Sequence, residues 1–163
     1  MGQEIERKYL LRSEDWKALA HRKIKMHQGY LCNNTQTSVR IRIEDQQANI
    51  NIKSMTVGIS RAEYEYSIPV ADASELLQTL CKKPQIQKTR YLVKHANKLW
   101  EIDAFEGDNA GLIVAEVELR SEDEQIEMPQ WIDKEVSMHE RYYNMRLTEY
   151  PYSEWSKNEK LGS

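Results

Sequence analysis

Charges of the same sign recur at alternate positions along this chain, usually with one apolar or aromatic residue between them. Near the N-terminus, Glu4 and Glu6 flank Ile5 in the stretch EIERK. Successive side chains of a β-strand point to opposite faces, so each such segment predicts a strand with one charged and one apolar face. The pairs are Glu4/Glu6, Glu63/Glu65, Glu101/Asp103, Glu116/Glu118, Arg40/Arg42 and Lys88/Arg90, with Lys8 and Lys53 single at the same parity.

Two arrangements can account for this charged face. In the first, the pairs lie on the solvated outer faces of a sandwich, and any single pair fits that interpretation. In the second, they face a charged interior, and the pairs taken together favour it. Like charges at positions i and i+2 are about 7 Å apart and repel one another. A surface selected only for solubility mixes signs, because opposite charges support one another across strands.

The segregated charges indicate external partners. Pairs of carboxylates suit hard divalent cations that take oxygen ligands, such as Mg²⁺ or Mn²⁺. Clustered Arg and Lys side chains suit phosphate oxygens, which arginine can bind in a bidentate manner. No P-loop motif, GxxxxGK[ST], occurs in the chain, so we expect side chains to hold any phosphate.

The remaining pattern predicts about eight strands and three or four helices in a mostly antiparallel meander. Nine candidate stretches for these strands lie near residues 4–11, 26–31, 37–45, 49–55, 61–70, 86–95, 98–107, 112–121 and 131–138, and the helices are predicted near 13–22, 72–83, 121–128 and 140–150. The hairpin between residues 37–45 and 49–55 is expected to turn across Gln46 and Gln47. Closing the strands into a barrel turns their charged faces inward, and long charged side chains then make a wet lumen. The predicted fold is therefore α+β, an eight-stranded antiparallel β-barrel (tunnel) with a charged lumen, flanked by helices.

Composition narrows the classes of function. With 163 residues the chain fits one domain, which we expect to span residues 1–157, followed by a tail at 158–163. Its 23 basic and 26 acidic residues give a net charge of −3, so no overall basic field attracts nucleic acid or a membrane. The two cysteines, Cys32 and Cys81, have no zinc-site spacing, and no export signal or membrane span is evident. We expect a cytoplasmic protein, either a monomer or a homodimer.

Several motifs together resemble one known family. The stretches EIERK, SVRIRI, INIKS, RAEYEYSIP, QKTRY, WEIDAFEG, AEVEL, KEV and RYYNMRL follow one another along nearly the whole chain. Their order resembles the CYTH superfamily of triphosphate tunnel metalloenzymes, and the opening EIERK resembles its short bacterial inorganic triphosphatases. The resemblance implies an eight-stranded antiparallel tunnel, with the C-terminal helix plugging one end.

The resemblance also implies a reaction, which is metal-dependent cleavage of the terminal phosphoanhydride of a triphosphate. The expected substrate is inorganic tripolyphosphate, which yields pyrophosphate and phosphate. A class IV adenylyl cyclase is the first alternative, and a thiamine or nucleoside triphosphatase is the second. A non-catalytic polyphosphate-binding module stays open as a hypothesis of another class, although the presence of every acidic pair favours an enzyme.

Roles follow for the charged residues. The basic residues expected to bind the triphosphate are Lys8, Arg40, Arg42, Lys53, Lys88 and Arg90. By analogy with the family, the first choice for Mg²⁺ or Mn²⁺ ligands is Glu4, Glu6, Glu116 and Glu118, with Glu101 and Asp103 available for a second metal. Glu63 and Glu65 are also available for a second metal or for positioning the attacking water, and with Lys8 they form the catalytic set. The sequence does not assign a general base.

Overall fold

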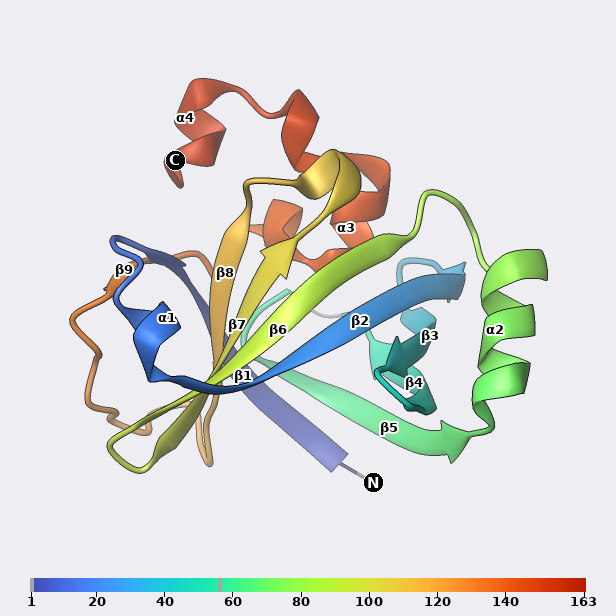
Figure 1. The fold of residues 1–163 in the computed structure, drawn as a ribbon, viewed down its shortest axis with the longest axis horizontal. Helices are drawn as coiled ribbons and strands as arrows, with labels where there is room; N and C mark the ends of the chain where they lie inside the picture. Colours follow the sequence, from blue (N-terminus) through green and yellow to red (C-terminus); the bar gives the residue numbers. More distant parts are fainter. Residues whose placement is uncertain (1, 56) are drawn as a thin grey trace.

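The computed structural model describes residues 2–55 and 57–163 and shows a closed antiparallel β-barrel (Figure 1). Within those residues one nine-stranded sheet has the order β5-β4-β3-β2-β6-β7-β8-β1-β9, and a further pairing between β5 and β1 closes its first eight strands into a ring. The strands are β1 (Gly2–Leu11), β2 (Ala20–Asn33), β3 (Thr37–Glu44), β4 (Gln47–Ser54), β5 (Ser60–Ile68), β6 (Ile86–His95), β7 (Lys98–Phe105), β8 (Ile113–Glu118) and β9 (Ile132–Glu135). The predicted eight-stranded tunnel is confirmed, and β9 adds a short strand beside the end of β1.

Helices are short and lie outside the barrel or at one end of it (Figure 1). The α-helices are α1 (Trp16–Leu19), α2 (Val70–Thr79), α3 (Asn144–Glu149) and α4 (Lys157–Lys160), and the 3-10 helices are η1 (Gly107–Asn109), η2 (Glu140–Tyr142) and η3 (Tyr152–Glu154). In the part of the chain that the structure describes, no helix is both long and apolar enough to cross a membrane.

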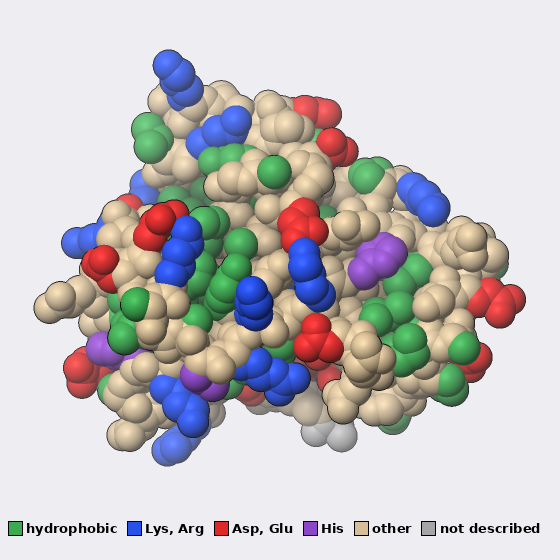
Figure 2. All heavy atoms as spheres, viewed as in Figure 1, with side chains coloured by type: hydrophobic (Ala, Val, Ile, Leu, Met, Phe, Trp, Pro, Cys, Tyr) green, Lys and Arg blue, Asp and Glu red, His purple; other side chains and the backbone are tan. Residues whose placement is uncertain are grey.

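Strand register brings the charged faces together inside the barrel. Glu6 lies opposite Glu118 and Lys8 lies opposite Glu116 where β1 pairs with β8. Arg90 lies opposite Asp103 where β6 pairs with β7. On the outside, the face over β2 and β6 mixes basic and acidic side chains, as a solvated surface does (Figure 2).

Apolar side chains fill the layers outside the lumen. Trp16 of α1 packs with Trp100 and Trp131 over the outer faces of β7 and β8. Helix α2 places Leu77 against the outer face of β3, where Ile41 is fully buried. This inversion of the usual arrangement, with the charged face inside, is the one that the alternating pattern predicts.

The C-terminal segment fills one end of the barrel. Tyr142, Leu147 and Trp155 pack with Ile86 and Phe105, whose positions on β6 and β7 have the same parity as the lumen-facing residues. The predicted plug therefore agrees with the structure, although it consists of η2 and α3 and not of one helix over residues 140–150.

Three other local predictions are wrong. Residues 121–128 form no helix, because apart from Ile126 and Met128 the segment is polar and offers no apolar stripe, and Ile126 packs on the outer core in irregular chain. The helix predicted at 13–22 stops at Leu19, since β2 begins at Ala20 and pairs with both β3 and β6.

The third concerns the hairpin between β3 and β4, which turns across Asp45 and Gln46 and not across Gln46 and Gln47. Asp45 has φ 51°, in the left-handed region that Asp tolerates better than most residues.

The division into residues 1–157 and a tail at 158–163 stays a prediction. Residues Lys157–Lys160 form α4, whose N-cap Ser156 makes a capping box with Glu159.

Candidate active site

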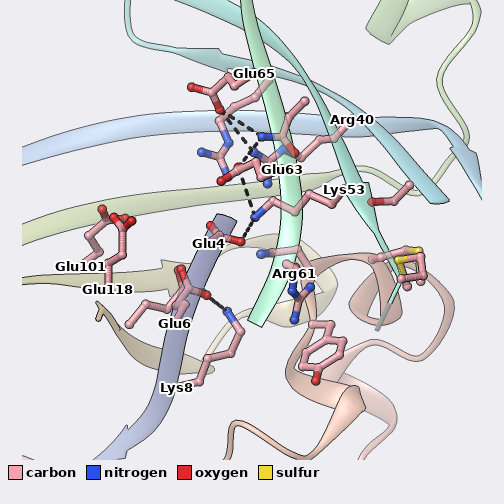
Figure 3. A pocket seen from close by; sticks show the side chains of 18 of the residues that line it. Glu4, Glu6, Lys8, Arg40, Lys53, Arg61, Glu63, Glu65, Glu101 and Glu118 are labelled. Atoms are coloured by element: carbon pink, nitrogen blue, oxygen red, sulfur yellow. Dashed lines mark hydrogen bonds and ion pairs between the residues drawn. The ribbon is translucent and has the colours of Figure 1, made fainter. Parts of the chain in front are cut away.

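The barrel encloses a polar cavity of about 280 Å³, and it is lined by nearly every charged residue that the sequence singles out. The lining includes Glu4, Glu6, Lys8, Arg40, Arg42, Lys53, Glu63, Glu65, Arg90, Glu101, Glu116 and Glu118. Lys88 and Asp103 do not line the cavity and have no exposed surface. The charged residues therefore converge from β1 and β3–β8, as Figure 3 shows for ten lining residues from β1, β3, β4, β5, β7 and β8.

One side of the cavity is formed by two buried arginines of β3, which we call the arginine wall (Arg40 and Arg42). The nearest carboxylate to Arg40 is Glu65, whose Oε2 lies 4.0 Å from Nη2. Within residues 2–55 and 57–163, the buried Nε of Arg40 has no hydrogen-bond partner. Burial, with the charge of Arg42, lowers the pKa of Arg40 to about 10. The positive charge of Arg40 is therefore only weakly compensated by the protein.

Arg42 is somewhat better supported than Arg40. Its Nε donates to Oε1 of Gln28 at 3.1 Å, and its Nη1 donates to Oε1 of Glu44 at 2.8 Å. Burial works against ionisation of Glu44, but the guanidinium of Arg42 outweighs it and lowers the pKa of that carboxyl.

The opposite side is an alternating chain of charges, which we call the ion-pair wall (Lys8, Glu116, Arg90, Asp103 and Lys88). Nζ of Lys8 lies 2.5 Å from Oε1 of Glu116. Arg90 donates to both oxygens of Asp103, from Nε at 2.7 Å and from Nη2 at 2.8 Å, and also to Glu116 at 3.0 Å. Nζ of Lys88 lies 2.5 Å from Oδ2 of Asp103, so every member has an opposite charge beside it.

The electrostatics of the ion-pair wall follow from these contacts. Burial disfavours the charged form of each group, but the neighbouring opposite charges outweigh it at Lys8 and Arg90, whose pKa values are raised. The same balance lowers the pKa of Asp103 and, through Lys8 and Arg90, holds the pKa of Glu116 well below its ordinary value. Lys88 differs, because burial dominates there and lowers its pKa to about 7.

Lys53 joins acids from two other strands. Its Nζ lies 2.6 Å from Oε2 of Glu4 and 3.4 Å from Oε1 of Glu63 (Figure 3). Asn51 donates from Nδ2 to Glu63 at 2.5 Å and to Glu65 at 3.2 Å. Despite burial, Lys53 and Asn51 lower the pKa of Glu63, so this carboxylate is ionised at neutral pH.

Glu118 is the cavity carboxylate whose negative charge is least compensated by neighbouring basic groups. Burial and the charges of Glu4, Glu6 and Glu63 raise its pKa, and no ion pair of its carboxylate occurs among the described residues. Figure 3 shows Glu101 beside Glu118, with Glu4 and Glu6 on the neighbouring strand. No group of three Asp, Glu, His or Cys residues in the described chain is close enough to form a ready-made metal cage.

The structure adds lining residues that the sequence analysis missed, namely Tyr30, Ser38, Asn51, Met55, Arg61, Tyr143, Asn144 and Met145. Arg61 is a further cation, and its guanidinium lies 4.9 Å from the centre of the Tyr143 ring. The signal for Arg61 was present, because it has the same strand parity as Glu63 and Glu65. No pattern could identify Tyr143 and Asn144, which reach the cavity from the C-terminal segment.

A closed antiparallel barrel whose lumen is lined by opposed basic and acidic groups defines a β-tunnel protein with a charged interior. The family model for the CYTH domain matches residues 2–149 of this chain. The chain belongs to the CYTH domain family.

Known proteins similar to this chain include two named inorganic triphosphatases. The one from Acetivibrio thermocellus is 40% identical over 157 residues, covering 96% of this chain and 100% of that protein. The one from Nitrosomonas europaea is 35% identical over 149 residues, covering 88% of this chain and 95% of that protein. A crystal structure of an inorganic triphosphatase aligns with TM-score 0.64 and 30% identity, over 91% of this chain and 95% of the other. A protein of Pyrococcus horikoshii has the same fold, with TM-score 0.58 and 19% identity over 74% of this chain and 80% of the other.

Proposed function

We propose that this protein is a divalent-metal-dependent hydrolase that splits inorganic tripolyphosphate into pyrophosphate and phosphate. The observation that carries the proposal is the arginine wall, in which two buried guanidiniums face the cavity and the nearest carboxylate oxygen to that of Arg40 is 4.0 Å away. A bound triphosphate supplies the missing negative charge, and its oxygens accept hydrogen bonds from the free N–H groups of the arginines. The similarity to two inorganic triphosphatases over nearly the whole chain supports the same substrate.

The basic residues share the phosphates among them. Arg40, Arg42 and Lys53 bind from the β3 and β4 side, while Lys8 and Arg90 bind from the ion-pair wall. Lys88 does not line the cavity. It contacts Asp103 and Asn144, and through Asp103 it supports the position of Arg90. Because its pKa is raised, Lys8 stays protonated and can stabilise charge that develops on the leaving pyrophosphate.

The acidic residues fit a divalent metal ion. Carboxylate oxygens are the ligands that Mg²⁺ and Mn²⁺ prefer. Burial, together with the charges of Glu4, Glu6 and Glu63, raises the pKa of Glu118, and a bound cation offsets both effects. Glu4, Glu6, Glu116 and Glu118 are our first choice of ligands, with Glu101, which pairs with Arg90, next. Asp103 binds Arg90 and Lys88 and has no exposed surface, so it is the least accessible. Mg²⁺ usually takes one or two carboxylates plus substrate phosphates, so a cage of three acids is not required. When bound, such a metal neutralises phosphoryl charge and acidifies a coordinated water.

Hydrolysis forms one bond and breaks one. The oxygen of water attacks the terminal phosphorus, the bridging P–O bond breaks, pyrophosphate leaves with the bridging oxygen, and the attacking water gives up a proton to solvent. Glu63 and Glu65 lie on the cavity wall, and Glu63 is ionised, so either can orient that water. These roles are proposals for the side chains of this protein.

Phosphate release tests the function directly. We would measure it from tripolyphosphate, ATP and thiamine triphosphate, each with Mg²⁺, with Mn²⁺ and with a chelator. We expect tripolyphosphate with metal to be the best substrate, and Arg42→Ala and Glu6→Gln to be inactive with folding intact. Lys23→Ala, which removes an exposed charge from β2, serves as the control and should retain full turnover. Wild-type rates in both Arg42→Ala and Glu6→Gln would exclude the proposed tunnel mechanism.

A further inference from the structure

Strand β1 changes its partner beside Lys8. On one side β1 pairs with β8 over residues 6–9. On the other side it pairs with β5 over residues 2–5 and then with β9 from Tyr9 onward. The amide of Glu6 still reaches the chain near β5, because it donates to the carbonyl oxygen of Ile59 at 2.8 Å. Lys8 lies in the gap, where neither β5 nor β9 is paired with it.

Ser137 closes this gap with its side chain. The backbone N–H of Lys8 donates to Oγ of Ser137 at 2.9 Å, and the N–H of Val136 donates to the carbonyl oxygen of Lys8 at 2.8 Å. Ser137 is buried, and its hydroxyl donates to Oε1 of Glu135 at 2.7 Å. The donation to Glu135 orients a lone pair of Oγ toward the Lys8 amide, so the hydroxyl replaces a strand partner.

The same residue supports a second cation of the cavity. The hydroxyl of Tyr143 donates to the carbonyl oxygen of Ser137 at 3.1 Å. The ring of Tyr143 is the one on which the guanidinium of Arg61 stacks. Ser137 therefore contacts Lys8 directly and reaches Arg61 through Tyr143, although it does not line the cavity itself.

We propose that Ser137 is a positioning residue for Lys8. Its hydroxyl holds the backbone of Lys8 in place and thereby fixes the position of the ammonium group in the lumen. The inference rests on the proposed function, in which Lys8 contacts the triphosphate. A buried amide without an acceptor is costly, so loss of the hydroxyl lets β1 shift toward another partner. Such a shift moves Nζ away from its place between Glu6 and Glu116, where it now lies 2.8 Å and 2.5 Å from their oxygens.

The first experiment compares Ser137→Ala, Ser137→Thr and the matched control Asn109→Ala in the full chain. Asn109 is buried and accepts a backbone amide, that of Tyr152 at 2.9 Å, but it lies outside the cavity lining. We expect Ser137→Ala to lower kcat/KM for tripolyphosphate about tenfold, since small displacements of a binding group are costly. Ser137→Thr keeps the hydroxyl and should restore the rate, while Asn109→Ala should lower the melting temperature but not the rate.

A variant nearly equal in size covers the case in which Ser137→Ala does not fold. Ser137→Cys keeps the volume but offers only a weak sulfur acceptor, so it should lower kcat/KM in the same direction. A wild-type rate in whichever of these two variants folds would overturn the inference.

The second experiment separates positioning from general stability by a double-mutant cycle. Calorimetry without metal gives the tripolyphosphate affinity of the wild type, Ser137→Ala, Lys8→Gln and the double variant. We expect Ser137→Ala to weaken binding about tenfold in the wild type and not to weaken it further beside Lys8→Gln. Equal losses in both backgrounds would overturn the inference. If the wild type is active and Ser137→Ala has the same kcat/KM, this inference alone is wrong. If the wild type is inactive on every triphosphate, both the proposed function and this inference are wrong.

Discussion

The arginine wall and the ion-pair wall both contain buried arginines, yet the charges of these arginines are balanced differently. Arg90 has both oxygens of Asp103 within 2.8 Å, and its pKa is raised. Arg40 is equally buried, but its nearest carboxylate oxygen is 4.0 Å away and its pKa is lowered. The charge of Arg90 is therefore balanced without a ligand, whereas the charge of Arg40 is not.

The difference assigns a different task to each wall. Charges that are already paired cost little more to hold in place, so the ion-pair wall is preorganised and keeps Lys8 and Arg90 fixed. Unpaired buried charges destabilise the free protein, so the arginine wall gains most when a polyanion enters. The predictions below test this division, beginning with the largest expected effect.

Replacing Asp103 should cost the most stability. Asp103→Asn leaves Arg90 and Lys88 buried without their shared counter-charge, and breaking a buried pair in this way costs about 3–5 kcal/mol. Chemical denaturation measures the loss. The matched change on the other side is Glu65→Gln, whose carboxylate is half exposed and 4.0 Å from Arg40, and it should cost less than about 1 kcal/mol. Equal losses in the two variants would remove the distinction between the walls.

Replacing Arg40 should do the opposite, with a large loss of activity and no loss of stability. Arg40→Gln removes a buried charge that the protein barely compensates, so the unliganded protein should be as stable as the wild type or more stable. Turnover of tripolyphosphate should fall at least about a hundredfold, as it does when a preorganised charge donor is lost from an active site. Parallel melting curves and phosphate release measure both effects. A loss of stability in Arg40→Gln would show that the guanidinium of Arg40 stabilises the fold, which would contradict this division between the walls.

The alternating charges predicted which side chains point into the lumen, because the alternation of side chains between the two faces of a strand is a property of the backbone. Every residue of the like-signed pairs keeps the parity of its strand, so the inward direction of Arg42 and Glu118 follows once the barrel closes. The balance between the walls could not be predicted, because it depends on register across strands that are distant in sequence, such as Lys8 opposite Glu116.

The segments that break the pattern are the ones where the prediction failed. Tyr143 and Asn144 enter the cavity from a plug whose path is set by packing of Tyr142 and Leu147 against the barrel. Ser137 follows β9 and carries no charge, so nothing in its own stretch of sequence marks its contact with Lys8.

Glu118 tests the acidic side of the cavity. Glu118→Gln removes a proposed metal ligand, so the metal concentration for half-maximal activity should rise at least about tenfold, the loss that even outer-shell partners can cause. Without metal the variant should melt at a higher temperature than the wild type at neutral pH, because repulsion with Glu4, Glu6 and Glu63 is relieved. An unchanged metal requirement would remove Glu118 from the ligand set.

The smallest expected effect is the dependence of stability on pH, in which the two kinds of carboxylate have opposite signs. The pKa of Glu118 is raised in the folded state, so the folded protein takes up this proton first and the contribution of Glu118 to stability increases as the pH falls from 7. The pKa values of Glu116 and Asp103 are lowered, so below the ordinary values of 4.5 and 3.8 the unfolded chain takes up the protons and stability falls. Lys88, whose pKa is lowered to about 7, makes stability fall as the pH drops through 7, so the contribution of Glu118 is measured as the difference in melting temperature between the wild type and Glu118→Gln. As the pH is lowered from 7, the wild type should gain stability relative to Glu118→Gln, and both should lose stability below about pH 4. A difference that does not change with pH would contradict the assignment of the unpaired acidic charge to Glu118.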